Sequence, residues 1–166
     1  MKGIALCLFA FIPLLFALWK SEEIKEKRKM REGILQFLEE FYFQIKHFNR
    51  DQREILSSFE NKALEKSGFL ENLWRELEKD PLYAIKRGFE KNLPLFSFSK
   101  KSEDALKTFS SNFGIQSKNR QLLELNQTIE ILSETLKTEK TETENKIKMI
   151  QATGISAGLS ILILLI

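Results

Sequence analysis

Apolar side chains in the middle of the chain recur every three or four residues, which is the period of an α-helix. A first series begins at Ile34 and resumes in the same phase beyond polar Gln52. Between its two halves, Asn49 precedes Asp51, and Glu54 follows three residues later, so we expect one helix to end and a second to be capped here. The series consists of Ile34, Leu38, Phe41, Ile45, Phe48, Ile55 and Phe59.

Proline, serine and glycine divide the next part of the chain into short helices. An amphipathic helix ends before Pro81, because the residue that precedes a proline avoids the helical conformation. Pro81 then begins a helix that Pro94 closes, and a loop follows. Ser102 is expected to cap a third helix, which Gly114 ends. The apolar positions of the three helices are Phe69, Leu70, Leu73, Trp74 and Leu77; Leu82, Ile85 and Phe89; and Leu106, Phe109 and Phe113.

The last apolar series has the spacing of a coiled coil, and a long polar stretch follows it. Residues 137–148 are almost wholly polar and contain no Gly or Pro, so we expect one helix to run through them as a solvated stalk. No segment shows the alternation typical of strands. We therefore predict an all-α fold, a bundle of about five to six helices whose last helix is long. The series consists of Leu122, Leu125, Ile129, Leu132 and Leu136.

Both ends of the chain carry a long stretch without charge, at residues 3–19 and 149–166. Helices of these lengths are roughly 26 and 27 Å long, just enough to cross a hydrocarbon core of about 30 Å. We predict an N-terminal transmembrane helix at residues 1–19, a helical bundle domain at residues 20–148 and a C-terminal transmembrane helix at residues 149–166. A signal peptide is the alternative for the first stretch, although the usual small-residue cleavage site is missing.

Basic residues gather beside both predicted spans. On the other side there is only Lys2 with the amino terminus, so the positive-inside rule places residues 20–148 in the cytoplasm. A signal anchor that leaves the domain outside the cytoplasm is the alternative topology. The flanking residues are Lys20, Lys25, Lys27, Arg28, Lys29 and Arg31 next to the first span, and Lys146 and Lys148 next to the second, with Lys137 and Lys140 further away.

Small residues recur every four positions in the predicted C-terminal span. Gly154 and Gly158 form one such series, and Ala152, Ser156 and Ser160 form a second beside it. Small side chains let two helix backbones approach closely in lipid. The predicted partner is the first span or the same helix of a second copy, and ordinary use of small residues in a membrane helix is the alternative. The candidate packing positions are Gly154, Ser156, Gly158 and Ser160.

Composition removes several functional classes. The 26 Lys and Arg are finely mixed with 23 Asp and Glu, so the net charge of +3 forms no basic block and nucleic acid is not an expected partner. Cys7 and His47 are the only residues of their kinds, which excludes an intramolecular disulfide and a cysteine-based zinc site. His47 is interpreted as a half-exposed helix residue. No nucleotide-binding glycine loop occurs. We predict a protein that is not an enzyme, without catalytic residues, cofactor or metal.

Phenylalanine is abundant, and 11 of the 14 residues lie in the middle domain. We expect most of them to fill a helical core. A minority exposed as anchors for a partner protein is the alternative.

Several residues in the last third of the chain match a known pattern. A Gly is followed seven residues later by a Gln, and a Lys-Met pair precedes two Gly residues four apart and an aliphatic run. The pattern resembles the stage III sporulation protein AB family of endospore-forming bacteria. In that family a Leu precedes the first Gly of the span, where Thr153 stands here, and a Ser-Asp cap stands where Gln116 and Ser117 do. The matching residues are Gly114, Gln121, Lys148, Met149, Gly154 and Gly158, with Ser117 in the cap position.

The resemblance implies a non-enzymatic component of the channel-like complex that joins mother cell and forespore. It implies a place in the mother-cell membrane facing the forespore, with the middle domain similar to the platform domain of type II secretion systems. The implied partners are the secretion-type ATPase, stage III sporulation protein AA, other members of the complex and a second copy of the chain. A membrane-anchored coiled-coil scaffold of the cell envelope or division machinery is the alternative, and it predicts an extended dimeric rod.

Overall fold

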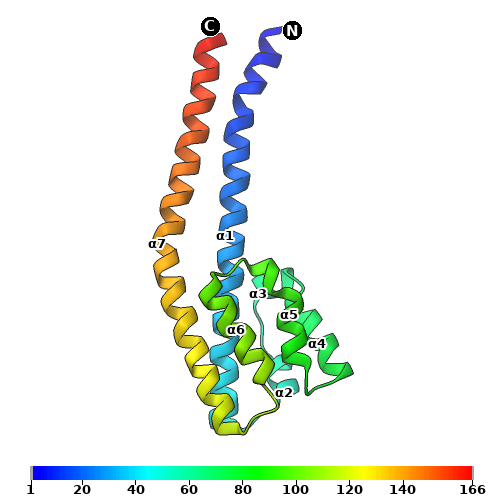
Figure 1. Cartoon of the computed structure of the whole chain (residues 1–166). Helices are drawn as coiled ribbons and strands as arrows, with labels where there is room; N and C mark the ends of the chain where they lie inside the picture. Colours follow the sequence, from blue (N-terminus) through cyan, green and yellow to red (C-terminus); the bar gives the residue numbers. More distant parts are fainter. Residues whose placement is uncertain (1, 166) are drawn as a thin grey trace. The chain divides into compact units, whose positions relative to one another are not determined.

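The computed structural model describes residues 2–165, and the side chains of residues 11–163 within them. All seven described helices are α-helices and no strand occurs in this range, which confirms the all-α prediction (Figure 1). Two helices are very long, with 47 residues in α1 and 48 in α7. The helices are α1 (Lys2–Phe48), α2 (Gln52–Ser58), α3 (Lys62–Lys66), α4 (Phe69–Lys79), α5 (Ala84–Phe96), α6 (Lys100–Asn112) and α7 (Lys118–Leu165).

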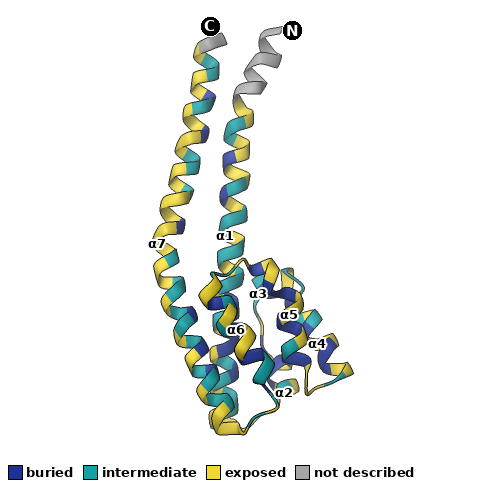
Figure 2. Cartoon of the chain, in the orientation of Figure 1, coloured by how far each residue is buried: buried dark blue, intermediate teal, exposed yellow. Residues whose placement is uncertain are grey.

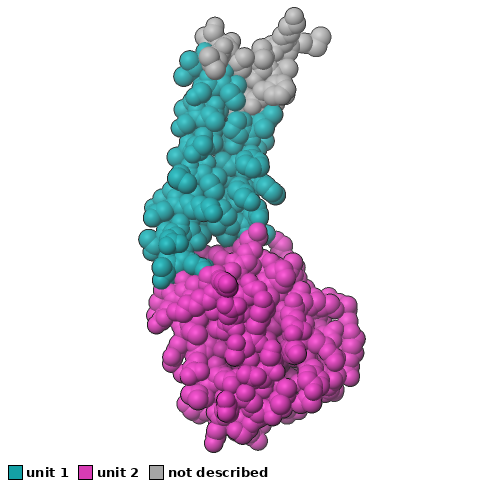
Figure 3. Space-filling view, viewed as in Figure 1, with its two compact units in different colours: residues 1–26, 138–166 teal, residues 27–137 magenta. Residues whose placement is uncertain are grey.

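The chain packs as two compact units (Figure 3). Unit 1 comprises residues 1–26 and 138–166, and unit 2 comprises residues 27–137. The first part of α1 and the last part of α7 therefore belong to unit 1, whereas α2 to α6 belong to unit 2. The domain boundaries predicted after residues 19 and 148 rest on the expected membrane topology and not on packing. They are therefore not tested by the division into two units, and they stay predictions.

The two predicted transmembrane helices, at residues 1–19 and 149–166, are not shown by the structure. Within the described residues, none of the helices combines the length and the apolar character that crossing a membrane requires. Residues 1–10 and 164–166, which supply part of both predicted spans, lie outside the residues whose side chains are described.

Local capping confirms several predicted helix boundaries. α1 ends at Phe48, and the Asp51 carboxylate accepts a hydrogen bond of 2.9 Å from the Glu54 N–H, which caps α2. α4 ends at Lys79, just before Pro81. Gly114, with a φ of +85°, follows the end of α6, and α7 then runs without a break.

Other predicted boundaries are wrong. α5 begins at Ala84 rather than at Pro81, because residues 81–83 form a turn in which Asp80 accepts a hydrogen bond from the Leu82 N–H. Pro94 lies inside α5, near enough to its end that only one late hydrogen bond of the helix is removed. Ser99, not Ser102, caps α6 by accepting from the Ser102 N–H.

Some positions and one helix also differ from the sequence expectation. The expected apolar-face residues Phe48, Trp74 and Leu82 are exposed. α3 has only five residues, too few to show a period, and depends on Asn61, whose side chain accepts from two backbone N–H groups. In the polar stretch of α7, Thr143 is buried within unit 1, so this stretch is not solvated on every side.

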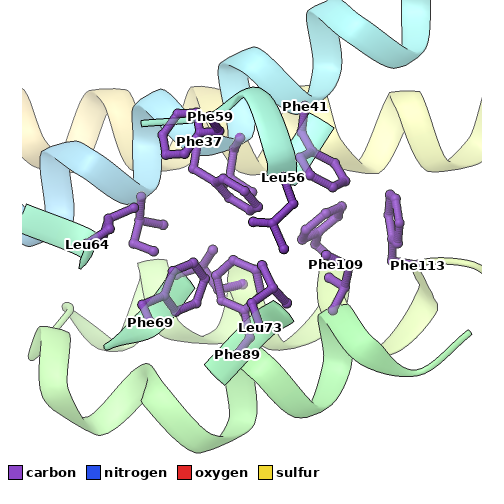
Figure 4. Packing of buried hydrophobic residues seen from close by; sticks show 14 of the residues in the cluster. Phe37, Phe41, Leu56, Phe59, Leu64, Phe69, Leu73, Phe89, Phe109 and Phe113 are labelled. Carbon is purple, nitrogen blue, oxygen red and sulfur yellow. The ribbon is translucent and has the colours of Figure 1, made fainter. Parts of the chain in front are cut away.

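Six phenylalanines form a closed circuit of ring contacts at the centre of unit 2 (Figure 4). Neighbouring centroids lie 4.8–6.3 Å apart, and each pair is tilted or edge-on, the arrangement that aromatic rings favour. Each such pair contributes about 0.5–1.5 kcal/mol beyond the buried area. We call this set the phenylalanine circuit; its members, in order, are Phe37, Phe69, Phe89, Phe109, Phe113 and Phe41, which returns to Phe37.

The prediction that most phenylalanines fill the core is confirmed, since eight of the eleven in the middle domain are buried. The coiled-coil-like series of α7 joins the same core: Leu125 and Leu132 have no exposed surface and belong to the cluster. The apolar seam of α7 therefore packs against other helices of the same chain.

A buried carboxylate links α4 to α5. Glu76 is only 6% exposed, and it accepts a hydrogen bond of 3.0 Å from Lys79, while the Lys91 Nζ lies 3.6 Å from the same oxygen. The hydrogen bond from Lys79 holds the pKa of Glu76 below its usual value, against the opposing effect of burial. Because Lys91 belongs to α5, the ionised carboxylate holds the two helices together.

We predict that Glu76→Gln lowers the free energy of unfolding at neutral pH, and that the difference from the parent shrinks as the pH falls below 4.5. A folded-state pKa below the unfolded one means that ionisation stabilises the fold above the unfolded pKa, and that this stabilisation is lost as the pH falls through the folded pKa. Urea unfolding at two pH values measures the effect, with Glu78→Gln as the exposed control on the same helix. A difference that is equal at both pH values would contradict the assignment.

Candidate functional site in the helix pair of unit 1

α1 and α7 approach each other closely at Gly154. A Cβ atom built on Gly154 would lie 2.5 Å from the Ala17 Cβ and 3.0 Å from the Pro13 carbonyl oxygen. Real Cβ atoms do not approach other atoms within 3.0 Å, and the obstruction here includes backbone, which cannot turn aside. Gly158, one turn further along α7, is also buried. The GxxxG pair therefore faces α1.

Small residues line α1 on the other side of this contact. Ala17 is 3% exposed and Ser21 1% exposed, and the Ser21 hydroxyl donates to the Ala17 carbonyl at 2.7 Å within the same helix. The hydrogen bond of the Ser21 hydroxyl is thus made within α1, so the hydroxyl requires no polar partner on α7. Figure 2 shows buried positions recurring along both helices of the pair. Close backbone approach through small residues is typical of helix pairs that associate without large apolar side chains between them.

The second small-residue series lies on a different face of α7. Ala152, Ser156 and Ser160 are exposed, and the Ser160 hydroxyl donates to the Ser156 carbonyl at 2.9 Å. The structure therefore separates the four candidate packing positions into two pairs. Gly154 and Gly158 meet α1, whereas Ser156 and Ser160 do not.

Large apolar side chains cover the outside of the same helix pair. They are 46–73% exposed, although they belong to the least polar residue types. In a pair stabilised by water exclusion, large apolar residues lie inside and small or polar ones outside. Unit 1 has the reverse order over residues 11–19 and 149–163, so the outer surface of this part is largely apolar. The exposed side chains are Phe11, Ile12, Leu15, Phe16, Leu18, Trp19, Met149, Ile155, Leu159 and Ile163.

The predicted basic flank is partly engaged in ion pairs and hydrogen bonds. Lys20 and Lys25 each pair with a glutamate three residues away, and Arg28 pairs with Glu32 at 2.8 Å. Arg31 donates to the Ser97 carbonyl at 3.0 Å, between α5 and α6. Such exposed pairs add little stability. Within the remaining flank, Lys27 is partly buried and Lys29, Lys146 and Lys148 are exposed.

The family-motif residues Gly114, Ser117 and Gln121 build the start of α7. A Cβ on Gly114 would lie 3.0 Å from the Leu82 carbonyl oxygen, and its φ of +85° also favours glycine. The Ser117 carbonyl accepts from the Gln121 N–H at 3.0 Å, and the Gln121 side chain donates back to the Gln116 carbonyl at 2.6 Å. These residues position a helix and a turn rather than a reactive group.

Groups suited to chemistry are not gathered in the part of the chain that the structure describes. No three His, Cys, Asp or Glu side chains there lie close enough together to hold a metal ion. His47 is exposed near the end of α1, where its ring centroid lies 4.9 Å from that of Phe43. Cys7 lies outside the residues whose side chains are described.

Sequence analysis found the α7 half of the contact in unit 1 and missed the α1 half. Pro13, Ala17 and Ser21 stand four residues apart, which is the same spacing as the glycines. Of the three, only Ala17 is a small residue within the first apolar stretch, because Pro13 is larger and Ser21 lies beyond Lys20, so spacing alone does not reveal this face of α1.

The family model described as stage III sporulation protein AB matches residues 2–166. No curated protein and no solved structure matches the chain significantly.

We predict that Gly154→Ile separates α1 from α7, because the larger side chain has no space against Pro13 and Ala17. Leu14 and Leu162 line one groove beside the contact, so cysteines at these two positions, in a Cys7→Ser background, report on the pairing through a short bismaleimide cross-linker. Gly154→Ile should reduce the cross-linked fraction several-fold, and Ser156→Ile, on the exposed face, should leave it unchanged. Equal cross-linking in the two variants would refute the packing role of Gly154.

Proposed function

The chain belongs to the stage III sporulation protein AB family, and from this premise we propose that it is a non-enzymatic membrane platform in the complex that joins mother cell and forespore. The observation that carries the proposal is the family match over residues 2–166, the whole length of both units. On this account, unit 1 holds the protein in the mother-cell membrane and unit 2 presents a docking body to a secretion-type ATPase.

Three features of unit 1 support a place in the membrane. Small residues meet between the helices while large apolar ones face outward, and lipid is the solvent in which this order is favourable. Trp19 is 62% exposed, and the Lys20 Nζ lies 5.8 Å from its ring, an amphipathic pair suited to the membrane–water interface. The Lys and Arg residues beside the apolar stretches favour a cytoplasmic location for the middle of the chain.

The packing of unit 2 supports a platform over an extended scaffold. A dimeric rod requires an apolar seam that is open to a second chain. Leu125 and Leu132, which lie on that seam in α7, are fully buried within a core that also includes residues of α1 and α2 to α6. The ATPase itself, stage III sporulation protein AA, is implied by the family resemblance.

Co-purification from sporulating cells tests the platform role. We expect the full-length tagged chain, extracted in mild detergent, to bring down the secretion-type ATPase, and an equally abundant unrelated membrane protein to fail to do so. Recovery of the intact chain with other complex members but without the ATPase would contradict the docking role.

Reporter fusions test the topology separately. At residue 60, we expect activity from a reporter that works only in the cytoplasm and none from a reporter that works only outside it. At the carboxyl terminus we expect the opposite result, because the basic residues flank residues 20–148. An extracytoplasmic signal at residue 60 would overturn the proposed orientation.

A further inference from the structure

Two phenylalanines of unit 2 lie outside the core and in contact with each other at the end of α1. Phe43 is 47% exposed and Phe48 58% exposed, and their ring centroids are 5.6 Å apart. His47 extends the cluster, because its ring centroid lies 4.9 Å from that of Phe43. Exposed aromatic rings that already pack together offer a large apolar contact area with little further loss of side-chain freedom.

Contacts between distant segments hold this cluster in place. Asn49 adopts a left-handed conformation with a φ of 54° directly after Phe48, and its side-chain oxygen accepts a hydrogen bond of 2.7 Å from Lys118 at the start of α7. The Arg50 guanidinium lies 5.8 Å from the centre of the Phe48 ring. The end of α1 is thus fixed before any partner arrives.

Basic residues are concentrated in the two segments that meet beside the aromatic pair. The two segments that meet here, residues 42–53 and 117–121, contain five Lys and Arg residues and a single acidic residue. That acid, Asp51, is committed to capping α2. The nearest acids outside the segments differ: Glu54, directly after Arg53, is exposed, whereas Glu40 accepts from Gln44, and Glu124 accepts from Asn112 and lies 3.9 Å from Arg120. Basic residues still outnumber acids five to two over residues 42–54 and 117–121. The five basic residues are Lys46, Arg50, Arg53, Lys118 and Arg120.

We propose that this aromatic-basic patch, formed by Phe43, His47, Phe48, Arg50 and Lys118, docks an acidic segment of a partner protein that carries an apolar side chain. Aromatic residues and Arg dominate the energetics of protein interfaces, and opposite charge guides the approach of the partner. The inference rests on the proposed function, because it names the surface through which a platform meets its partner.

One other surface and one other occupant fit less well. The groove of Leu56, Phe59, Leu70 and Trp74 also exposes an aromatic ring, but Glu65 lines it and it has no comparable concentration of one charge. An anionic membrane is the other possible occupant of the aromatic-basic patch. Membrane-surface helices carry their cations along one face beside a long apolar face, whereas here the basic residues lie in two segments that meet at a helix end, with Arg50 against the Phe48 ring.

Photocross-linking in sporulating cells tests the proposal with the full-length chain. A benzophenone amino acid placed at Phe48 should give a cross-link whose partner peptide, sequenced by mass spectrometry, contains more Asp and Glu than Lys and Arg. The same amino acid at exposed Leu95, on α5, should not give that product. The double variant Arg50→Glu and Lys118→Glu should reduce the yield of the cross-link at least ten-fold.

The double variant Lys62→Glu and Lys86→Glu, which makes the same change of charge elsewhere in unit 2, should leave the yield unchanged. A product with lipid, with a basic segment or with a second copy of this chain would overturn the proposal, as would equal loss in both double variants. If the ATPase is still recovered but the cross-link is absent, the docking role of the aromatic-basic patch is overturned and the platform role remains intact. A cross-link to an acidic segment of another protein, without ATPase recovery, would support the aromatic-basic patch as a docking surface. The same result would contradict the proposal that the platform docks the ATPase.

Discussion

The phenylalanine circuit is the interaction on which unit 2 depends. Its six members come from α1, α4, α5, α6 and the turn after α6, so the circuit closes only when all of these segments are in place. Phe37 and Phe69 have the widest reach, because each contacts a third ring outside the circuit, Phe59 and Phe96 respectively. Loss of one ring removes two pair contacts and opens a cavity in a close-packed interior. The circuit therefore makes the docking of α1 and the folding of the short helices parts of one event.

The two units are stabilised by opposite packing orders, although α1 and α7 contribute to both. Unit 2 encloses large apolar rings and, apart from the paired carboxylate of Glu76, leaves its charged residues outside, as water requires. Unit 1 brings Gly154 against Ala17 and leaves its large apolar residues outside. Close backbone contact of this kind can hold two helices together when large apolar side chains are not enclosed between them. A single pair of long helices can thus contribute to a water-adapted body and to a surface suited to lipid.

Sequence patterns predicted the features that depend on neighbouring residues. The breaks at Asp51, Pro81 and Gly114 were predictable because capping and helix termination act over a few positions. The five-residue α3 was not, since it shows no period. The glycine half of the unit 1 contact was predictable from spacing, but the face that each small residue occupies depends on packing. The aromatic-basic patch escaped prediction because Asn49 and Lys118 are 69 residues apart, and mixed signs along the chain conceal a charge that gathers only in space.

Hydrogen–deuterium exchange of the full-length chain and its Phe69→Ala variant tests most directly whether unit 2 is one body closed by the phenylalanine circuit. Loss of a buried Phe side chain costs about 3–5 kcal/mol. The account predicts that amide protection falls together in α4, α5 and residues 34–48 of α1, because the same circuit holds them. Protection in residues 34–48 that stays at the parent level while α4 and α5 lose theirs would contradict it.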